Sequence, residues 1–265
     1  MKAKKSYGQH FLTSDSIAER IADSLSGTGY ANILEVGPGM GMLSQYLIKK
    51  PKSYYAVEAD REMIPILEEK FPDLKGHIML SDFLKVNLNE FPPEAGSIAL
   101  IGNYPYNISS QIIFQMLEYM DRIPEMVGMF QKEMAERIVA EPGSKTYGVI
   151  SVLTQAYYDG KLLFSVKPGS FNPPPKVNSA VIRLVRREVP ISDVDNRWFR
   201  KVVKQAFSQR RKMLRNTLKG LVEDPSFFLD QEFNERPEQL SVRDFVNLTK
   251  RILKQRELES GSTGL

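Results

Sequence analysis

Hydrophobic residues follow two patterns through the first half of the chain. Short apolar runs predict buried strands, and apolar residues three to four positions apart predict helices. The expected strands are Asn32–Val36, Tyr54–Glu58, His77–Leu80, Ser97–Ile101 and Met126–Phe130. The expected helices cover residues 42–49, 61–71 and 110–119. Strands that alternate with helices predict an α/β fold with a mostly parallel sheet covered on both faces.

The pattern changes near Pro190. Two further strands are expected at Leu162–Val166 and Ala180–Val185, and antiparallel pairing would make them a late hairpin at the sheet edge. Beyond Pro190 only helical patterns remain, around residues 197–207, 213–221 and 242–253. We therefore predict an α/β domain over residues 1–190, a small all-α domain over 191–258, and a disordered polar tail over 259–265.

Composition narrows the function classes. The 265 residues include no cysteine, which excludes disulfides, cysteine-ligated zinc and thiol catalysis. No apolar run is long enough to span a membrane, and the basic N-terminus lacks the apolar core of a secretory signal, so we expect a cytoplasmic protein. Residues 196–215 contain eight basic and no acidic side chains. This block is either a phosphate-binding surface or a solvated helix face.

A glycine-rich turn follows the first predicted strand. The run Glu35-Val36-Gly37-Pro38-Gly39-Met40-Gly41 has the spacing Gly-X-Gly-X-Gly, which differs from the dinucleotide-binding fingerprint. It resembles the first motif of S-adenosylmethionine methyltransferases, where glycines let the backbone approach a ligand closely. The alternative is an ordinary turn between a strand and a helix.

Acidic residues end the next two predicted strands. Glu58 could accept hydrogen bonds from both hydroxyls of a ribose, and Asp82 from the amine of an adenine whose ring packs on Phe83. A surface carboxylate and a turn-forming aspartate are the alternatives. Because the carboxyl ends of parallel strands meet at one edge of a sheet, these residues are expected to cluster with Gly37 and Asn103.

The loop Asn103-Tyr104-Pro105-Tyr106 follows the fourth predicted strand. It resembles the (Asn/Asp/Ser)-X-Pro-(Tyr/Phe) motif of methyltransferases that act on amine nitrogens. An adenine amine is a poor nucleophile because its lone pair is delocalised into the ring. Two acceptors can favour a tetrahedral nitrogen that points its lone pair at a methyl donor, so that the reaction needs mainly positioning and no strong base.

Motifs along nearly the whole chain resemble the ribosomal RNA adenine dimethyltransferases of the KsgA and Erm families. The matching segments are Tyr7–Leu12, Asn103–Ser109, Gln131–Glu133, Phe171–Val181 and Phe207–Lys212. The proline-rich segment and the Gln-Arg-Arg-Lys run favour the KsgA type. Two positions depart from the family pattern: His10 stands where asparagine is usual, and Tyr104 where leucine is usual.

The resemblance implies roles for individual residues. His10, Leu12, Gly37, Glu58, Asp82 and Asn103 would bind S-adenosylmethionine, with Glu58 on the ribose and Asp82 on the adenine. The loop Asn103, Tyr104, Pro105 and Tyr106 would be catalytic, with the Asn103 side-chain oxygen and the Tyr104 carbonyl accepting from the target amine. Tyr106 would stack on the flipped adenine, and Phe171 would cover its other face. Arg210, Arg211 and Lys212, together with Lys2, Lys4 and Lys5, would contact RNA phosphates.

The implied reaction transfers four methyl groups in all to two adjacent adenosines near the 3′ end of small-subunit ribosomal RNA. The implied partner is an immature small ribosomal subunit, with a role in its biogenesis. We expect a monomer that needs no metal and no membrane. An Erm-type enzyme for large-subunit RNA is the first alternative, and the segment Phe171–Val181 argues against it. A binding module, as in related mitochondrial transcription factors, and a DNA adenine methyltransferase are the others.

Overall fold

The computed structural model describes residues 10–92 and 96–262. Contacts divide the chain into two compact units: Met1–Ala135 with Gly160–Arg186, and Glu136–Asp159 with Arg187–Leu265. The sequence-based boundary near Pro190 lies close to Arg187, but that prediction assigned residues 136–159 to the first domain. They group with the second unit because α6 (Val149–Gln155) packs on α7 (Asn196–Ala206) and α9 (Val242–Ser262).

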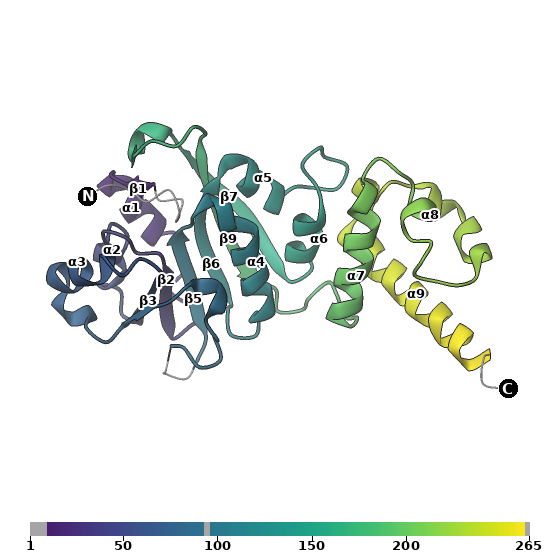
Figure 1. The fold of residues 1–265 in the computed structure, drawn as a ribbon, viewed down its shortest axis with the longest axis horizontal. Coiled ribbons are helices and arrows are strands. Elements are labelled where there is room, and N and C mark those ends of the chain that lie inside the picture. Colours follow the sequence, from purple (N-terminus) through teal and green to yellow (C-terminus); the bar gives the residue numbers. More distant parts are fainter. Residues whose placement is uncertain (1–9, 93–95, 263–265) are drawn as a thin grey trace. The chain divides into compact units, whose positions relative to one another are not determined.

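The main sheet of the first unit is mostly parallel, as the sequence predicts (Figure 1). Its strand order is β4-β3-β2-β5-β6-β9-β7, and β9 runs antiparallel to β6. The chain builds β2, β3 and β4 outward on one side and then crosses to β5 and β6 on the other. The strands are β2 (Asn32–Val36), β3 (Ser53–Glu58), β4 (Ile78–Leu80), β5 (Ile98–Asn103), β6 (Glu125–Gln131), β7 (Tyr158–Val166) and β9 (Ser179–Arg186).

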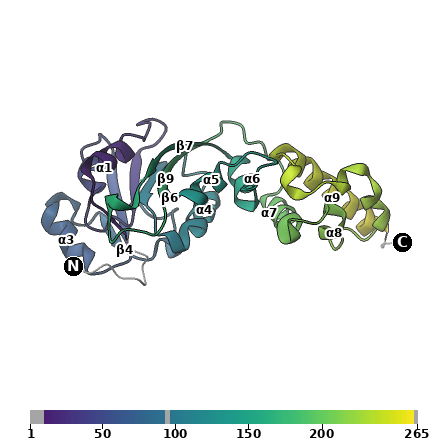
Figure 2. The ribbon, with the colours of Figure 1, turned by 90° about the horizontal axis from the view of Figure 1, so that it is seen from above.

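Helices cover both faces of this sheet because its central strands are apolar on both sides. Ile33 and Ala99 join α1 in one buried cluster, whereas the alternate residues Leu34 and Leu100 point to the other face. In Figure 2, α1 and α4 lie on opposite sides of the strands. The helices are α1 (Asp15–Ala22), α2 (Ser44–Leu47), α3 (Met63–Lys70), α4 (Ser109–Glu118) and α5 (Lys132–Ile138).

A two-stranded sheet lies beside the main one in the first unit. Here β1 (Phe11–Leu12) pairs antiparallel with β8 (Phe171–Asn172), and Leu12 stands opposite Phe171. The pairing joins two segments that are 160 positions apart, and both contribute residues to the main hydrophobic core.

The second unit is helical, as predicted. The expected helix at 213–221 is only α8 (Leu214–Thr217), and Gly220 follows it closely. The tail prediction is wrong for residues 259–262, because α9 continues to Ser262. The Glu259 carboxylate accepts from the backbone N–H groups of Glu223 and Asp224, which ties this end of the helix down. Residues 263–265 lie outside the described part of the chain. No helix among the described residues is long and apolar enough to cross a membrane.

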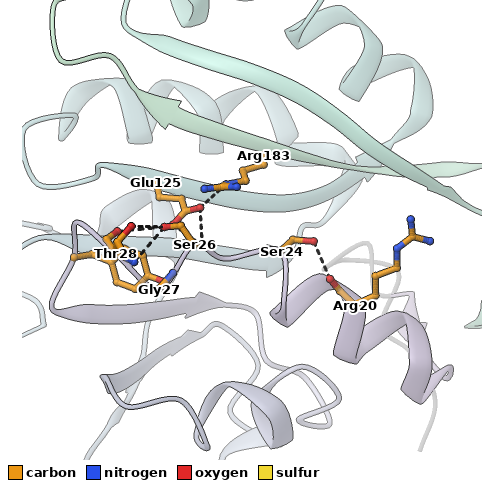
Figure 3. A network of polar contacts seen from close by, with 8 residues as sticks. Arg20, Ser24, Ser26, Gly27, Thr28, Glu125 and Arg183 are labelled. Carbon is orange, nitrogen blue, oxygen red and sulfur yellow. Dashed lines mark hydrogen bonds and ion pairs between the residues drawn. The ribbon is translucent and has the colours of Figure 1, made fainter.

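A buried carboxylate anchors the loop between α1 and β2. Glu125, at the start of β6, accepts hydrogen bonds from the Ser26 backbone N–H and hydroxyl and from Arg183 Nε (Figure 3). Glu125 is 2% exposed. This network lies at the amino end of β6, away from the strand ends that carry the sequence motifs.

Candidate functional site

A cavity of about 340 Å³ opens at the carboxyl ends of β2, β3 and β5. It lies where the strand order reverses between β2 and β5, the place where open α/β sheets bind ligands. The cavity brings together residues predicted from separate motifs: His10, Leu12, Gly37, Glu58, Asp82, Asn103, Tyr104, Pro105 and Tyr106. The predicted clustering of Gly37, Glu58, Asp82 and Asn103 is therefore confirmed.

The glycine-rich turn lies in a conformation that only glycine adopts easily. Gly37, Gly39 and Gly41 have φ values of 69°, 54° and 75°. Space is also short, because a Cβ at Gly41 would lie 2.5 Å from the Phe71 ring. The turn ends β2 at the cavity, and the Gly39 N–H donates to Glu58 Oε2 at 3.0 Å. The first motif is thus fastened to the acidic residue of the second strand.

Glu58 is buried at the end of β3. One of its oxygens accepts from Gly39, and the other accepts from the Asp60 N–H at 2.8 Å. Burial raises the pKa of Glu58, although backbone hydrogen bonds from Asp60, Gly39 and Ala59 oppose this rise. A carboxylate oxygen has further lone pairs, so Glu58 can hold the turn and still accept from ligand hydroxyls.

Glu35 lies beneath the same turn and also lines the cavity. Its Oε2 atom accepts from the hydroxyls of Tyr54 at 2.6 Å and Ser44 at 2.8 Å. Burial raises the pKa of Glu35 from 4.5 to about 7, against the opposing effect of both hydroxyls. A carboxyl group that titrates near neutrality therefore forms part of the cavity wall.

This titration predicts how stability depends on pH. Between pH 4.5 and about 7 the folded protein holds a proton on Glu35 that the unfolded chain releases, so the free energy of unfolding falls as pH rises. A shift of this size corresponds to about 3 kcal/mol. The Glu35→Gln variant, whose amide oxygen can accept from both hydroxyls, should match wild type near pH 4.5. It should exceed wild type by up to about 3 kcal/mol at pH 8.

Urea unfolding at both pH values measures this difference. Glu69→Gln is the matched control, because Glu69 is exposed in the same unit. Parallel pH dependences for wild type and Glu35→Gln would contradict a carboxyl group that titrates near neutrality.

Asp82 forms a turn and also lies at the cavity, so its two interpretations from the sequence are compatible. Its Oδ1 atom accepts from the Leu84 N–H at 3.0 Å and begins the short helix Phe83–Lys85. The side chain is exposed at the cavity, and Phe83 beside it is buried and lines the same wall. The carboxylate can thus accept from a ligand amine with its other oxygen while Phe83 supplies an apolar surface.

The orientation of the Asn103 amide follows from one hydrogen bond. Asn103 Nδ2 lies 2.9 Å from the backbone carbonyl of His10. Because a carbonyl oxygen only accepts, the atom that faces it must be the amide nitrogen. Asn103 Oδ1 is then the atom that can accept from a substrate amine at the cavity.

Tyr106 is fixed from two sides. Its hydroxyl lies 2.6 Å from Ser179 Oγ, and its ring stacks on His10 with centroids 5.4 Å apart. His10 Nδ1 lies 2.8 Å from the Pro173 carbonyl, which holds the imidazole in place. The His10–Tyr106 stack gave no signal in the sequence, because the two rings lie on separate segments.

The Tyr104 side chain points into the protein core. It is 1% exposed, and its ring packs against Phe130 with centroids 4.9 Å apart. The ring lies against Gly102 and Gly128, where an added Cβ would collide with it. Tyrosine is unusual at this position, and it fits because these two glycines leave space for its ring. The side chain thus differs from the family pattern, while the backbone of the loop remains at the cavity.

The Tyr104 hydroxyl is buried and has no hydrogen-bond partner among the described residues. Burial of an unpaired polar group costs about 1–3 kcal/mol. We therefore expect Tyr104→Phe to raise the free energy of unfolding by about 1 kcal/mol in urea titrations. Tyr54→Phe is the matched control and should be destabilised, because the Tyr54 hydroxyl donates to Glu35. A destabilised Tyr104→Phe variant would contradict this account.

Two residues that are predicted to contact the substrate make structural contacts within the protein. The Phe171 side chain is 4% exposed, belongs to the hydrophobic core and does not line the cavity. A stacking role for Phe171 would require its ring to leave that core. Arg210 is half-buried, and its guanidinium donates to the Ser144 carbonyl at 3.0 Å. Its neighbours Arg211 and Lys212 are exposed.

Some lining residues were given no role of their own from the sequence. Besides Glu35, they include Pro38, Met40, Ser81 and Ile108. Each lies within three residues of a predicted site residue, so proximity to a motif was the available signal. Lys2, Lys4 and Lys5, predicted to contact phosphate, lie outside the described residues.

Comparisons with known proteins agree over nearly the whole chain. The family described as ribosomal RNA adenine dimethylase matches residues 1–254. A relative from Flavobacterium johnsoniae named ribosomal RNA small subunit methyltransferase A is 52% identical, covering 95% of this chain and 96% of the relative. A relative of the same name from Parabacteroides distasonis is 49% identical, covering 98% and 96%.

Solved structures have the same architecture. A dimethyladenosine transferase from Plasmodium falciparum gives a TM-score of 0.80 at 24% identity, with 93% of this chain and 98% of that chain covered. The 23S rRNA methyltransferase ErmE gives a TM-score of 0.69 at 25% identity, covering 91% and 99%. The fold thus recurs in solved structures.

Proposed function

The chain belongs to the ribosomal RNA adenine dimethylase family, and from this premise we propose that it methylates adenosines of small-subunit ribosomal RNA. The proposed targets are two adjacent adenosines near the 3′ end, in an immature small subunit. S-adenosylmethionine would supply the methyl groups. The enzyme would act in the cytoplasm as a monomer during subunit biogenesis.

The observation that carries this proposal is the direction of the Asn103 amide. Its nitrogen is engaged by the His10 carbonyl, so its oxygen can accept from an exocyclic amine at the cavity. The Tyr104 backbone carbonyl would be the second acceptor. Together they would hold the amine nitrogen tetrahedral with its lone pair directed at the methyl donor. Binding of the base would thus also position the reacting atoms.

The other cavity residues fit the cofactor. The buried Glu58 carboxylate would accept from the ribose hydroxyls, and Asp82 would accept from the adenine amine above the Phe83 surface. The glycine-rich turn would allow the methionine portion to approach the backbone closely. His10 and Leu12 would border the same ligand. Two carboxylate acceptors beside an apolar surface suit the ribose hydroxyls and the adenine of an adenosine group.

Small-subunit RNA is favoured over the Erm-type alternative. Relatives named small subunit methyltransferase A are 49–52% identical over nearly the whole chain, whereas ErmE is 25% identical. A binding-only role is disfavoured because Glu58, Asp82 and Asn103 meet at one cavity.

The test uses tritiated S-adenosylmethionine with unmethylated small subunits, followed by mapping of the labelled nucleotides. Large-subunit RNA is assayed in parallel. Label on two adjacent adenosines near the 3′ end of the small-subunit RNA is the expected result. Label on large-subunit RNA alone would favour the Erm-type reaction, and cofactor binding without transfer would favour a binding module.

The basic block of the second unit gives a separate prediction about RNA binding. Arg211 and Lys212 are exposed, and each phosphate contact contributes about 0.7–0.9 to the slope of log K against log salt. Changing both to glutamine should weaken subunit binding and reduce this slope by about 1.5. Filter binding at several salt concentrations measures the slope.

The matched control removes the same two charges from the first unit, through Arg61→Gln with Lys75→Gln. Arg210→Gln should mainly lower stability, because Arg210 bonds to the Ser144 carbonyl. An unchanged salt slope in the Arg211 and Lys212 variant would indicate that these two side chains form a solvated face and do not contact phosphate.

A further inference from the structure

The stack of His10 on Tyr106 has a consequence for substrate entry. Both rings line the cavity, with centroids 5.4 Å apart and planes inclined by 28°. Paired aromatic rings have centroids about 4.5–7 Å apart. The two rings are therefore a direct pair, with no room for a third ring between them.

Both partners are held where they are. The Tyr106 hydroxyl contacts Ser179 Oγ at 2.6 Å, which fixes the position of the far end of its ring. His10 Nδ1 must donate to the Pro173 carbonyl, because that oxygen only accepts. The His10 backbone is also tied, since its carbonyl accepts from Asn103 Nδ2 at 2.9 Å. Among the described residues, only the hydrogen bond to Pro173 holds the His10 side chain, so once it breaks the imidazole can rotate away from Tyr106 while the backbone stays at Asn103.

We propose that His10 is a placeholder for the target adenine: its ring covers Tyr106 until RNA binds, and the flipped base then takes its place. The inference rests on the proposed methyl transfer to adenine. A purine presents a larger stacking surface to Tyr106 than an imidazole does, so it can displace the ring. His10 is then a positioning residue, and it lowers RNA affinity because its own stack must be broken.

The direction in which RNA affinity changes when the His10 ring is removed distinguishes a placeholder from a fixed second wall of the base pocket. If His10 were a wall that sandwiches the base, removing its ring would weaken RNA binding. If it is a placeholder, removing its ring strengthens binding, because the base no longer competes with it. Loss of one aromatic pair corresponds to about 2- to 10-fold in affinity.

The experiment measures binding of unmethylated small subunits to the full-length protein with unreactive S-adenosylhomocysteine present. His10→Asn removes the ring but can still donate to Pro173, and His10→Ala removes both. Both variants should bind subunits about 2- to 10-fold more tightly than wild type, with the KM for subunits lowered by the same factor. His10→Phe keeps a ring and should stay within about two-fold of wild type.

Equal or weaker subunit binding by His10→Asn and His10→Ala would overturn the placeholder role. S-adenosylhomocysteine affinity and urea unfolding are measured on each variant, so that a misfolded variant is recognised and the other ring-free variant decides. Failure of the proposed function itself would appear differently, as wild-type protein that transfers no methyl groups to adenosine.

Discussion

Replacing Asn103 with alanine should reduce methyl transfer to small subunits by about 10²- to 10³-fold, the usual effect of removing one preorganised polar group at a reacting centre. Asn103 Oδ1 is the side-chain acceptor directed to the cavity, because Nδ2 is engaged by the His10 carbonyl. Its loss leaves the target amine planar and its lone pair delocalised. The change should appear in kcat, because the acceptor matters most when the nitrogen becomes tetrahedral.

The Asn103→Ala result is interpretable only with cofactor binding measured beside it. We expect S-adenosylhomocysteine affinity to stay within about 10-fold of wild type, because Glu58 and the glycine-rich turn remain in place. Asn89→Ala is the matched control, since Asn89 is an exposed asparagine in the same unit. Wild-type turnover by Asn103→Ala with intact cofactor binding would contradict the assigned role.

Much of the site could be predicted because the strands of a parallel sheet are buried on both faces. Such strands are continuous apolar runs, so their ends can be located in the sequence. β2 has the sequence NILEV and β5 has the sequence IALIGN, and the motif residues begin where each apolar run ends. Parallel pairing then places Gly37, Glu58 and Asn103 at one sheet edge without further information.

The features that the sequence did not predict depend on contacts between distant segments. The register of β5 and β6 places Gly102 opposite Gly128, and this pairing makes space for the Tyr104 ring. Neither glycine by itself predicts this space from the sequence. Phe171 similarly pairs with Leu12 through strands of only two residues each, which buries a ring expected at the substrate. Residues 136–159, which include α6, were placed in the first domain because their sequence does not indicate which helices they pack against.

The largest stability effect should come from Glu125, at the amino end of β6. Glu125→Ala removes the acceptor for the Ser26 N–H and hydroxyl and leaves Arg183 without this partner. Breaking a buried ion pair from one side costs about 3–5 kcal/mol. The Arg183 side chain is 34% exposed and can be partly rehydrated, so we expect about 3 kcal/mol in urea unfolding.

The companion variant Arg183→Ala tells whether the loop or the ion pair matters more. Glu125 would then be a buried carboxylate without Arg183, but it would keep both hydrogen bonds from Ser26, so Arg183→Ala should cost less than Glu125→Ala, about 2 kcal/mol. In the double variant the loss of Glu125 should still be large, because the loop that leads into β2 has lost its anchor (Figure 3). Equal costs for the two single variants would assign the stability to the ion pair instead. Since the network lies at the opposite ends of the strands from the cavity, cofactor affinity of the folded variants should not change.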